Sequence, residues 1–211
     1  MIGVAGVLRR AGDVVVAVTA LVLLSPVVLA AAVGVRVTMG RGVVYRQTRL
    51  GLGGRPFELL KLRTMREPSP GREGPEHDAE RMTRFGSWLR STSIDELPSL
   101  VNILRGDLAL VGPRPLPTGY WERFRGSEYE RFLVRPGLTG LAQVNGRNAL
   151  GWPERLRSDV EYVRTRSLRG DVAILCRTVP VVLGRGGVAE PGGVTMTALP
   201  ADRDPTDPGY A

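Results

Sequence analysis

The longest apolar run of the chain lies near its N-terminus, where residues 14–35 carry only apolar, small or weakly polar side chains. A helix of this length extends roughly 33 Å, about the thickness of the hydrocarbon core of a bilayer. Ser25 and Pro26 lie near the middle of the run, and a proline inside a helix removes a backbone hydrogen bond and bends the helix. The pattern therefore predicts a membrane helix with a kink at Ser25-Pro26.

Three topologies fit this run. A cleaved secretory signal would begin at Arg9-Arg10, but the apolar run is long for that role. A helix that spans the bilayer has the right length, and the heavier positive charge after the run would place the rest of the chain in the cytoplasm. A re-entrant helix would instead enter and leave one face of the bilayer as two half-helices of roughly 18 Å each. The residues alone do not choose between spanning and re-entrant topologies.

Apolar residues at helical spacing predict further helices along the chain. These helices cover residues 78–90, 118–133 and 153–168. The first two mix arginines with aromatic and apolar residues, a pattern that suits either an amphipathic interfacial membrane helix or the protein core. Residues 171–183 fit a helix or a strand, although Pro180 argues against a strand in the middle of a sheet.

Clusters of apolar and β-prone residues between turn signals predict three short strands. The strands cover residues 43–46, 57–62 and 108–111. After residue 184 the chain is rich in Gly and Pro and has almost no apolar mass, as expected for a disordered tail. We therefore predict a mainly helical α+β fold with a small β-sheet. Its parts are an N-terminal membrane helix (1–40), a main domain (41–184) and a tail (185–211).

The composition limits the chemistry. The formal net charge of +8 predicts an anionic partner, which is a nucleic acid, an anionic membrane surface or a phosphorylated substrate. The single cysteine, Cys176, excludes an internal disulfide, and with His77 as the only histidine a Cys/His zinc site is not expected. Cys176 lies in an apolar run and is expected in the core. Nucleophilic or acid–base chemistry therefore falls to carboxylates.

Two adjacent carboxylates, Asp95 and Glu96, stand just before Pro98 and an apolar run. Because proline is tolerated in the first turn of a helix, Pro98 predicts a helix that begins near Asp95. Asp95 is then either a simple N-cap or part of a catalytic centre. Four segments that hold cations beside Pro or Gly turns favour the second interpretation, because a guanidinium on a rigid turn suits phosphate. They are Lys61–Met65, Gly112–Pro115, Arg135–Gly140 and Gln143–Asn148.

Taken in order, these motifs resemble the bacterial sugar transferases, the monotopic polyprenyl-phosphate phosphoglycosyl transferases of the small single-domain type. The resemblance covers residues 9–184. It rests on Ser25-Pro26, Gln47-Thr48-Arg49-Leu50-Gly51, Lys61-Leu62-Arg63-Thr64-Met65, Ser93-Ile94-Asp95-Glu96-Leu97-Pro98, Gly106-Asp107, Val111-Gly112-Pro113-Arg114-Pro115 and Arg135 through Asn148. Ile94 and Leu62 replace the family's common Leu and Phe, and Gly42-Val43 replaces a common Gly-Pro, but the catalytic positions match.

The resemblance implies transfer of a sugar 1-phosphate from a UDP-sugar to polyprenyl (undecaprenyl) phosphate, with release of UMP. This is the first membrane step of bacterial glycan assembly. It further implies that Asp95 is the nucleophile, which forms a covalent aspartyl-phosphosugar, and that Glu96 binds the cofactor Mg²⁺. From the residues alone, the roles of Asp95 and Glu96 are interchangeable. Neither the sugar nor the polyprenyl length nor the glycan pathway is indicated.

The same resemblance implies that Ser25-Pro26 is the break of a re-entrant helix. The catalytic domain (41–184) then lies on the cytoplasmic face of the bacterial inner membrane, in contact with phospholipids. The expected phosphate or nucleotide contacts are Arg114 and Arg147, with Lys61, Arg63 and Arg135 as further candidates. The membrane helix and the aromatic segments leave room for a homodimer.

Two other functions fit parts of the sequence. A nucleic-acid-binding module fits the positive charge, but the acidic pair among the arginines argues against nucleic acid as a partner. A catalytically inactive scaffold is disfavoured by the intact Asp95-Glu96 pair.

Overall fold

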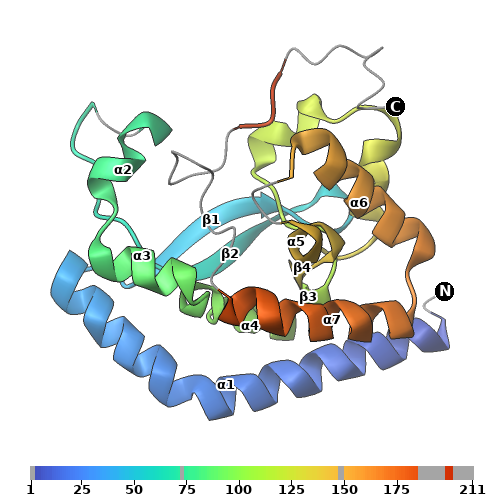
Figure 1. The fold of residues 1–211 in the computed structure, drawn as a ribbon, viewed down its shortest axis with the longest axis horizontal. Helices are drawn as coiled ribbons and strands as arrows, with labels where there is room; N and C mark the ends of the chain where they lie inside the picture. The colour runs from blue at the N-terminus through green and yellow to red at the C-terminus, as the bar shows by residue number, and fades with distance from the viewer. Residues whose placement is uncertain (1–2, 72–73, 147–149, 185–197, 202–211) are drawn as a thin grey trace.

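The computed structural model describes residues 3–71, 74–146, 150–184 and 198–201. Over these residues the fold is mainly helical α+β, as predicted (Figure 1). The helices are α1 (Val4–Met39), α2 (Asp78–Arg81), α3 (Arg84–Ser91), α4 (Ser99–Arg105), α5 (Leu141–Asn145), α6 (Trp152–Thr165) and α7 (Leu168–Leu183). The strands are β1 (Val44–Leu50), β2 (Pro56–Leu62), β3 (Ala109–Val111) and β4 (Gly137–Thr139). Short 3₁₀ helices are η1 (Leu52–Gly54), η2 (Pro75–His77), η3 (Ile94–Glu96), η4 (Thr118–Arg123) and η5 (Gly126–Leu133).

Helix α1 runs as one helix of 36 residues along one side of the molecule, and its ribbon bends near the middle (Figure 1). Pro26 lies inside the helix and cannot donate a hydrogen bond to the carbonyl of Val22. The hydroxyl of Ser25 donates to that carbonyl instead, at 2.8 Å. By length and composition α1 could cross a membrane, a test that a signal sequence also passes. Its re-entrant topology stays a prediction.

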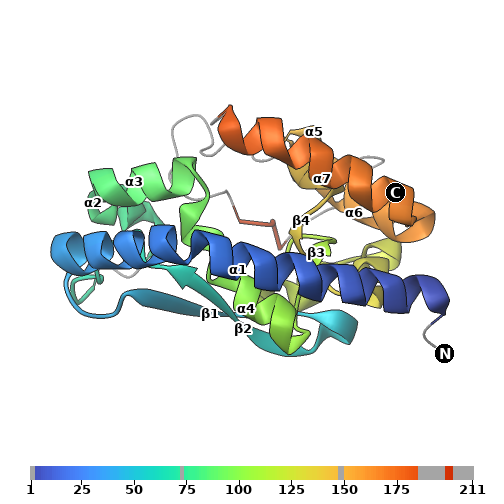
Figure 2. The ribbon, with the colours of Figure 1, turned by 90° about the horizontal axis from the view of Figure 1, so that it is seen from below.

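Polar side chains fix the N-terminal half of α1 to the rest of the fold. Arg9 forms an ion pair with Asp171 of α7 at 2.6 Å. Arg10 donates to two carbonyls in the last turn of α4, those of Ile103 and Leu104, at 2.6 and 3.0 Å. Helix α1 therefore packs against α4 on one side, and Figure 2 shows α7 running beside it on the other.

The described residues form two small sheets, which hold the two cations that contact Glu96: Lys61 lies on β2 and Arg114 follows β3. Strands β1 and β2 pair antiparallel, and β3 and β4 pair in parallel. The first three strands were predicted from the sequence. Strand β4 was not predicted, because it is only three residues long and lies within the segment Arg135–Gly140, which has the residues of a turn. The segment that follows β3 lies very close to the segment that precedes β4. Gly112 makes this close approach possible, because a Cβ at this position would collide with the backbone of Arg135.

Helix α4 lies at the centre of the core. Leu100 and Ile103 are buried in one cluster with Ala17 of α1 and Leu59 of β2. Asn102, which has no exposed surface, accepts a hydrogen bond from the backbone N–H of Leu60 at 3.0 Å and so ties α4 to β2. Since α4 directly follows the acidic pair, this packing fixes the pair relative to β2.

Three expectations about the elements were wrong. The helix expected over 78–90 is divided into α2 and α3, because Thr83 caps α3 by accepting a hydrogen bond from Gly86 at 2.9 Å. The segment 118–133 forms η4 and η5 rather than one α-helix. Cys176 is exposed rather than in the core, since α7 buries a different face, centred on Ile174.

The remaining expectations had mixed outcomes. Residues 171–183 are helical, and they extend α7 through Pro180. Of the aromatic residues in η4 and η5, Phe132 is buried, while Trp121 is 39% exposed. Most of the predicted tail lies outside the described residues, but Leu199 is fully buried in a cluster with Phe124. The proposed domain boundaries stay predictions.

Candidate active site

The acidic pair lies in η3, on the turn that joins α3 to α4. Ser93, just before it, adopts φ 57° and ψ 15°, and it is the one non-glycine residue with positive φ in the described part of the chain. Such a conformation costs about 1–3 kcal/mol and is common at functional sites. Asp95 is not the N-cap of α4, contrary to the expectation, because Pro98 occupies that position and the helix begins at Ser99.

Glu96 is held by two cations from different parts of the chain. Its Oε1 atom accepts hydrogen bonds from Lys61 Nζ at 2.6 Å and from Arg114 Nη2 at 3.0 Å. Lys61 lies on β2 and Arg114 follows β3, so the fold brings together two of the cations predicted from the sequence. Burial would raise the pKa of Glu96, but Lys61 and Arg114 more than offset this effect and hold the pKa below its usual range. Glu96 is therefore ionised at neutral pH.

Asp95 has a different environment from its neighbour. Its side chain is buried, with 7% of the residue exposed, and the described residues give its carboxylate no hydrogen bond. Burial and then the charge of Glu96 raise the pKa of Asp95 to about 6, although Lys61, Arg90 and Arg114 act in the opposite direction. A carboxylate that is ionised at neutral pH and not engaged by a donor is free to act as a nucleophile. The environments thus distinguish two residues whose roles the sequence left interchangeable.

Two of the other predicted cations, Arg63 and Arg135, form no hydrogen bond or ion pair with the acidic pair. Arg63 is 6% exposed and donates to the carbonyl of Met39 at 2.6 Å, so it caps the C-terminal end of α1. Arg135 donates to the carbonyl of Gly106 at 2.9 Å, just after α4. Arg147 lies outside the described residues. Both described arginines thus bind backbone carbonyls, and their contact with phosphate stays a prediction.

Two arginines near the pair were not singled out from the sequence. Arg90 of α3 donates to Thr64 at 3.0 Å, and its charge helps to lower the pKa of Asp95. Arg49 of β1 belongs to a shallow pocket beside Glu96. That pocket is lined by Arg49, Leu59, Lys61, Glu96, Ser99, Leu108, Arg114, Pro115, Gly137 and Leu138. The Gln47–Gly51 motif was the available signal for Arg49, but a motif does not show which way its side chains point.

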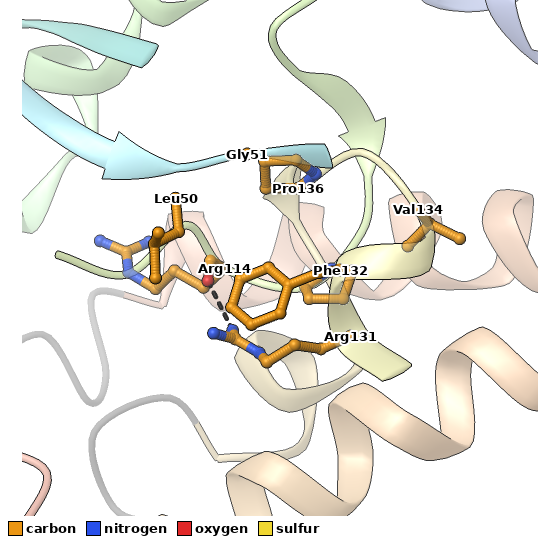
Figure 3. Close-up of a pocket in the computed structure, with 8 residues that line it drawn as sticks. Leu50, Gly51, Arg114, Arg131, Phe132, Val134 and Pro136 are labelled. Atoms are coloured by element: carbon orange, nitrogen blue, oxygen red, sulfur yellow. Dashed lines mark hydrogen bonds between the residues drawn. The ribbon is translucent and has the colours of Figure 1, made fainter. Parts of the chain in front are cut away.

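A buried ion pair supports the backbone of Arg114. Arg131 donates to Asp159 at 2.8 Å and also to the carbonyl oxygen of Arg114 at 2.7 Å. The dashed line in Figure 3 marks the second contact, and the ring of Phe132 lies beside it. The pair fixes the segment from which the Arg114 side chain extends toward Glu96.

Known proteins resemble this chain over most of its length. The sequence model of the bacterial sugar transferases matches residues 4–185. This chain belongs to the bacterial sugar transferase family. It is 41% identical over 198 residues to the uncharacterised sugar transferase EpsL of Bacillus subtilis, covering 94% of this chain and 98% of EpsL.

Other relatives of this sugar transferase have names that state a reaction. This chain is 45% identical over 185 residues to the UDP-glucose:undecaprenyl-phosphate glucose-1-phosphate transferase of Caulobacter vibrioides. The matched residues cover 83% of this chain and 69% of that protein. A protein of the same name from Escherichia coli is 37% identical over 188 residues, which cover 84% of this chain but 40% of that longer protein.

The carboxylates of this sugar transferase suit one kind of metal site. The described residues contain no group of three or more His, Cys, Asp or Glu side chains that would form a complete protein cage. Asp95 and Glu96 supply at most two carboxylates, and both contacts to Glu96 use Oε1, which leaves Oε2 for a cation. Mg²⁺ at phosphate-handling sites is commonly bound by one or two carboxylates together with substrate oxygens and water. The donor set fits such a site.

Proposed function

We propose that this chain moves a sugar 1-phosphate from a UDP-sugar to polyprenyl phosphate and releases UMP. The names of its Caulobacter vibrioides and Escherichia coli relatives support this reaction class, with UDP-glucose as their donor and undecaprenyl phosphate as their acceptor. The observation that carries the mechanism is the asymmetry of the acidic pair. Glu96 is fixed by two cations, whereas Asp95 has no hydrogen bond among the described residues and a pKa of about 6.

In the first step, an oxygen of ionised Asp95 attacks the phosphorus that carries the sugar. A new P–O bond to Asp95 forms while the bond from that phosphorus to the bridging oxygen of the diphosphate breaks, and UMP leaves with the electron pair. The sugar 1-phosphate is then held on Asp95 as an acyl phosphate. Lys61 and Arg114, both within hydrogen-bonding distance of Glu96, lie next to this centre and can neutralise phosphate oxygens.

In the second step, a phosphate oxygen of the lipid attacks the same phosphorus. The bond to Asp95 breaks, the carboxylate is restored and the product is a polyprenyl-diphosphate-linked sugar. The division into two steps means that the anionic lipid phosphate never has to displace UMP directly. Mg²⁺, when held by Glu96 and by diphosphate oxygens, would supply additional neutralisation of charge on the leaving group.

Helix α1 would hold this chemistry at the membrane surface. We propose that it is re-entrant about Ser25-Pro26, with the catalytic domain on the cytoplasmic face and in contact with phospholipids. External labelling of intact cells tests this topology with Gly3→Cys and Arg41→Cys variants, in a Cys176→Ser background because Cys176 is exposed. Labelling of neither site agrees with the re-entrant helix, whereas labelling of residue 3 alone shows a spanning helix. A homodimer also stays a prediction.

The reaction is tested by UMP release from a panel of UDP-sugars, with Mg²⁺ and undecaprenyl phosphate, by the detergent-solubilised protein. Wild type and Asp95→Asn are compared, and Glu58→Gln is the matched control because its side chain is 56% exposed on β2. We expect wild type and the control to release UMP from at least one donor and Asp95→Asn to release none above background. Equal release by Asp95→Asn would exclude Asp95 as the nucleophile.

A further inference from the structure

Arg49 is a third cation in the wall of the pocket beside Glu96. It lies near the end of β1, opposite Phe57 of β2 in the sheet register. The same pocket is lined by Lys61 and Arg114, the two cations that hold Glu96. Three positive side chains and one negative side chain therefore line this pocket.

The hydrogen bonds of Arg49 differ from those of the other two cations. Its guanidinium donates to two neutral acceptors, the carbonyl of Pro115 at 3.3 Å and the side-chain oxygen of Gln47. Its Nε atom is buried and has no hydrogen-bond partner in the described part of the chain. Lys61 and Arg114, in contrast, each contact a carboxylate. A buried donor without a partner is costly, so Arg49 has unused capacity for an acceptor.

The neighbouring charges also favour an anion at Arg49. Burial and then the charge of Arg114 lower the pKa of Arg49 to about 10, which still leaves it positive at neutral pH. Two like charges in one pocket repel each other, and an anion between them removes that repulsion. Because guanidinium groups bind phosphate oxygens two at a time, a phosphate or diphosphate is the anion that suits this pair.

A purely structural role does not account for this arrangement. A backbone hydrogen bond already fixes the end of β1 to the segment after Pro115, since the N–H of Leu50 donates to the carbonyl of Leu116 at 2.9 Å. A neutral side chain would serve as well as a half-buried arginine in the contact with Pro115, at a 3.3 Å distance that is long for a strong hydrogen bond.

We propose that Arg49, together with Arg114, binds phosphate oxygens of a substrate in the pocket beside Glu96. This inference rests on the proposed function. The donor diphosphate and the polyprenyl phosphate offer the same chemistry, and the kinetic experiment distinguishes them.

The test compares Arg49→Gln and Arg49→Lys with wild type. Arg46→Gln is the matched control, because Arg46 lies on the same strand with its side chain 65% exposed and paired with Glu58 outside the pocket. KM is measured separately for the UDP-sugar and for undecaprenyl phosphate. Loss of a hydrogen bond to a charged group predicts a rise of about 10- to 100-fold in one KM for Arg49→Gln, with a smaller rise for Arg49→Lys.

A rise in the donor KM places the donor diphosphate at Arg49, and a rise in the acceptor KM places the lipid phosphate there. Arg49→Gln with both KM values unchanged overturns the inference, whether or not kcat or thermal stability falls. Because wild-type turnover is measured in parallel, failure of the proposed function is seen separately, as absence of UMP release from wild type.

Binding is also measured without turnover, by the thermal unfolding of each protein with and without inorganic pyrophosphate. A ligand that binds the folded state raises the unfolding temperature. We expect pyrophosphate to raise it for wild type and Arg46→Gln, but not for Arg49→Gln. Equal protection of wild type and Arg49→Gln overturns the inference, and Arg49→Lys supplies the comparison if Arg49→Gln does not fold.

Discussion

The acidic pair leads to an unusual prediction about stability, in which neutralising two adjacent carboxylates has opposite effects. The pKa of Asp95 is raised from 3.8 to about 6 by its burial and by Glu96. One pKa unit corresponds to about 1.4 kcal/mol, so keeping Asp95 ionised at neutral pH costs the fold up to about 3 kcal/mol. Asp95→Asn removes this charge with almost no change of shape. We therefore expect it to stabilise the protein at pH 7.5.

The dependence of this gain on pH follows from the direction of the shift. Between pH 4 and 6 the folded protein binds more protons at Asp95 than the unfolded chain does, so the contribution of Asp95 to stability falls as the pH rises through this range. The advantage of Asp95→Asn is thus near zero at pH 4 and complete above pH 7. For a chain of this size, about 1 kcal/mol shifts the unfolding temperature by about 2–4 °C, so a rise of several degrees is measurable.

Glu96→Gln should have the opposite effect. Lys61 and Arg114 hold the pKa of Glu96 below its usual range, so its charge stabilises the fold above about pH 4.5, and that stability is lost as the pH falls. The glutamine variant also leaves Lys61 partly buried without its anionic partner. We expect a lower unfolding temperature than wild type at pH 7.5, with a smaller difference at pH 4.

The assay is thermal unfolding of detergent-purified protein at pH 4 and pH 7.5, in EDTA so that a bound cation does not alter the charge at the site. Glu58→Gln serves as the control for removal of an exposed carboxylate. The reasoning is refuted if Asp95→Asn is less stable than wild type at pH 7.5, or if its gain is the same at both pH values.

Three further predictions concern residues that support the site. Arg131→Met leaves Asp159 charged and buried, so we expect a loss of about 3–5 kcal/mol in denaturant unfolding; a loss below 1 kcal/mol would contradict this. Arg63→Gln removes the cap at Met39, and we expect a lower unfolding temperature with both KM values unchanged, whereas a raised KM would give Arg63 a substrate role. Gly86→Ala places a Cβ against a backbone carbonyl, and we expect a lower unfolding temperature than for Gly3→Ala, where the space is open.

Much of the fold could be predicted because its signals are local. The apolar run of α1 and the β-prone clusters of β1 and β2 reflect burial patterns that each segment carries by itself. The segment 118–133 shows the limit of this reasoning, because its apolar spacing is helical but η4 and η5 separate at Phe124-Arg125. Cys176 shows a related limit, since an apolar run does not indicate which face of α7 contacts the core.

The site was predicted in part for a similar reason. Asp95, Glu96, Lys61 and Arg114 were named from the sequence, and the fold brings the last two to Glu96. Arg63 looked equivalent to Lys61 in sequence, because alternation along a strand places residues two apart on the same face. However, β2 ends at Leu62, and Arg63 donates to the carbonyl of Met39 instead of Glu96. The sequence also could not show that Glu96 is held by Lys61 and Arg114 while Asp95 is not, because these contacts join segments far apart in the chain.

Formation of a covalent intermediate on Asp95 tests the central claim most directly. The protein is incubated with Mg²⁺ and a UDP-sugar that carries ³²P in the phosphate next to the sugar, without polyprenyl phosphate, and the label is mapped by proteolysis and mass spectrometry. The account predicts that about one UMP is released per active site and that the label is bound to Asp95 and is discharged by added lipid phosphate. UMP release that requires the lipid, with no label on the protein, would contradict it.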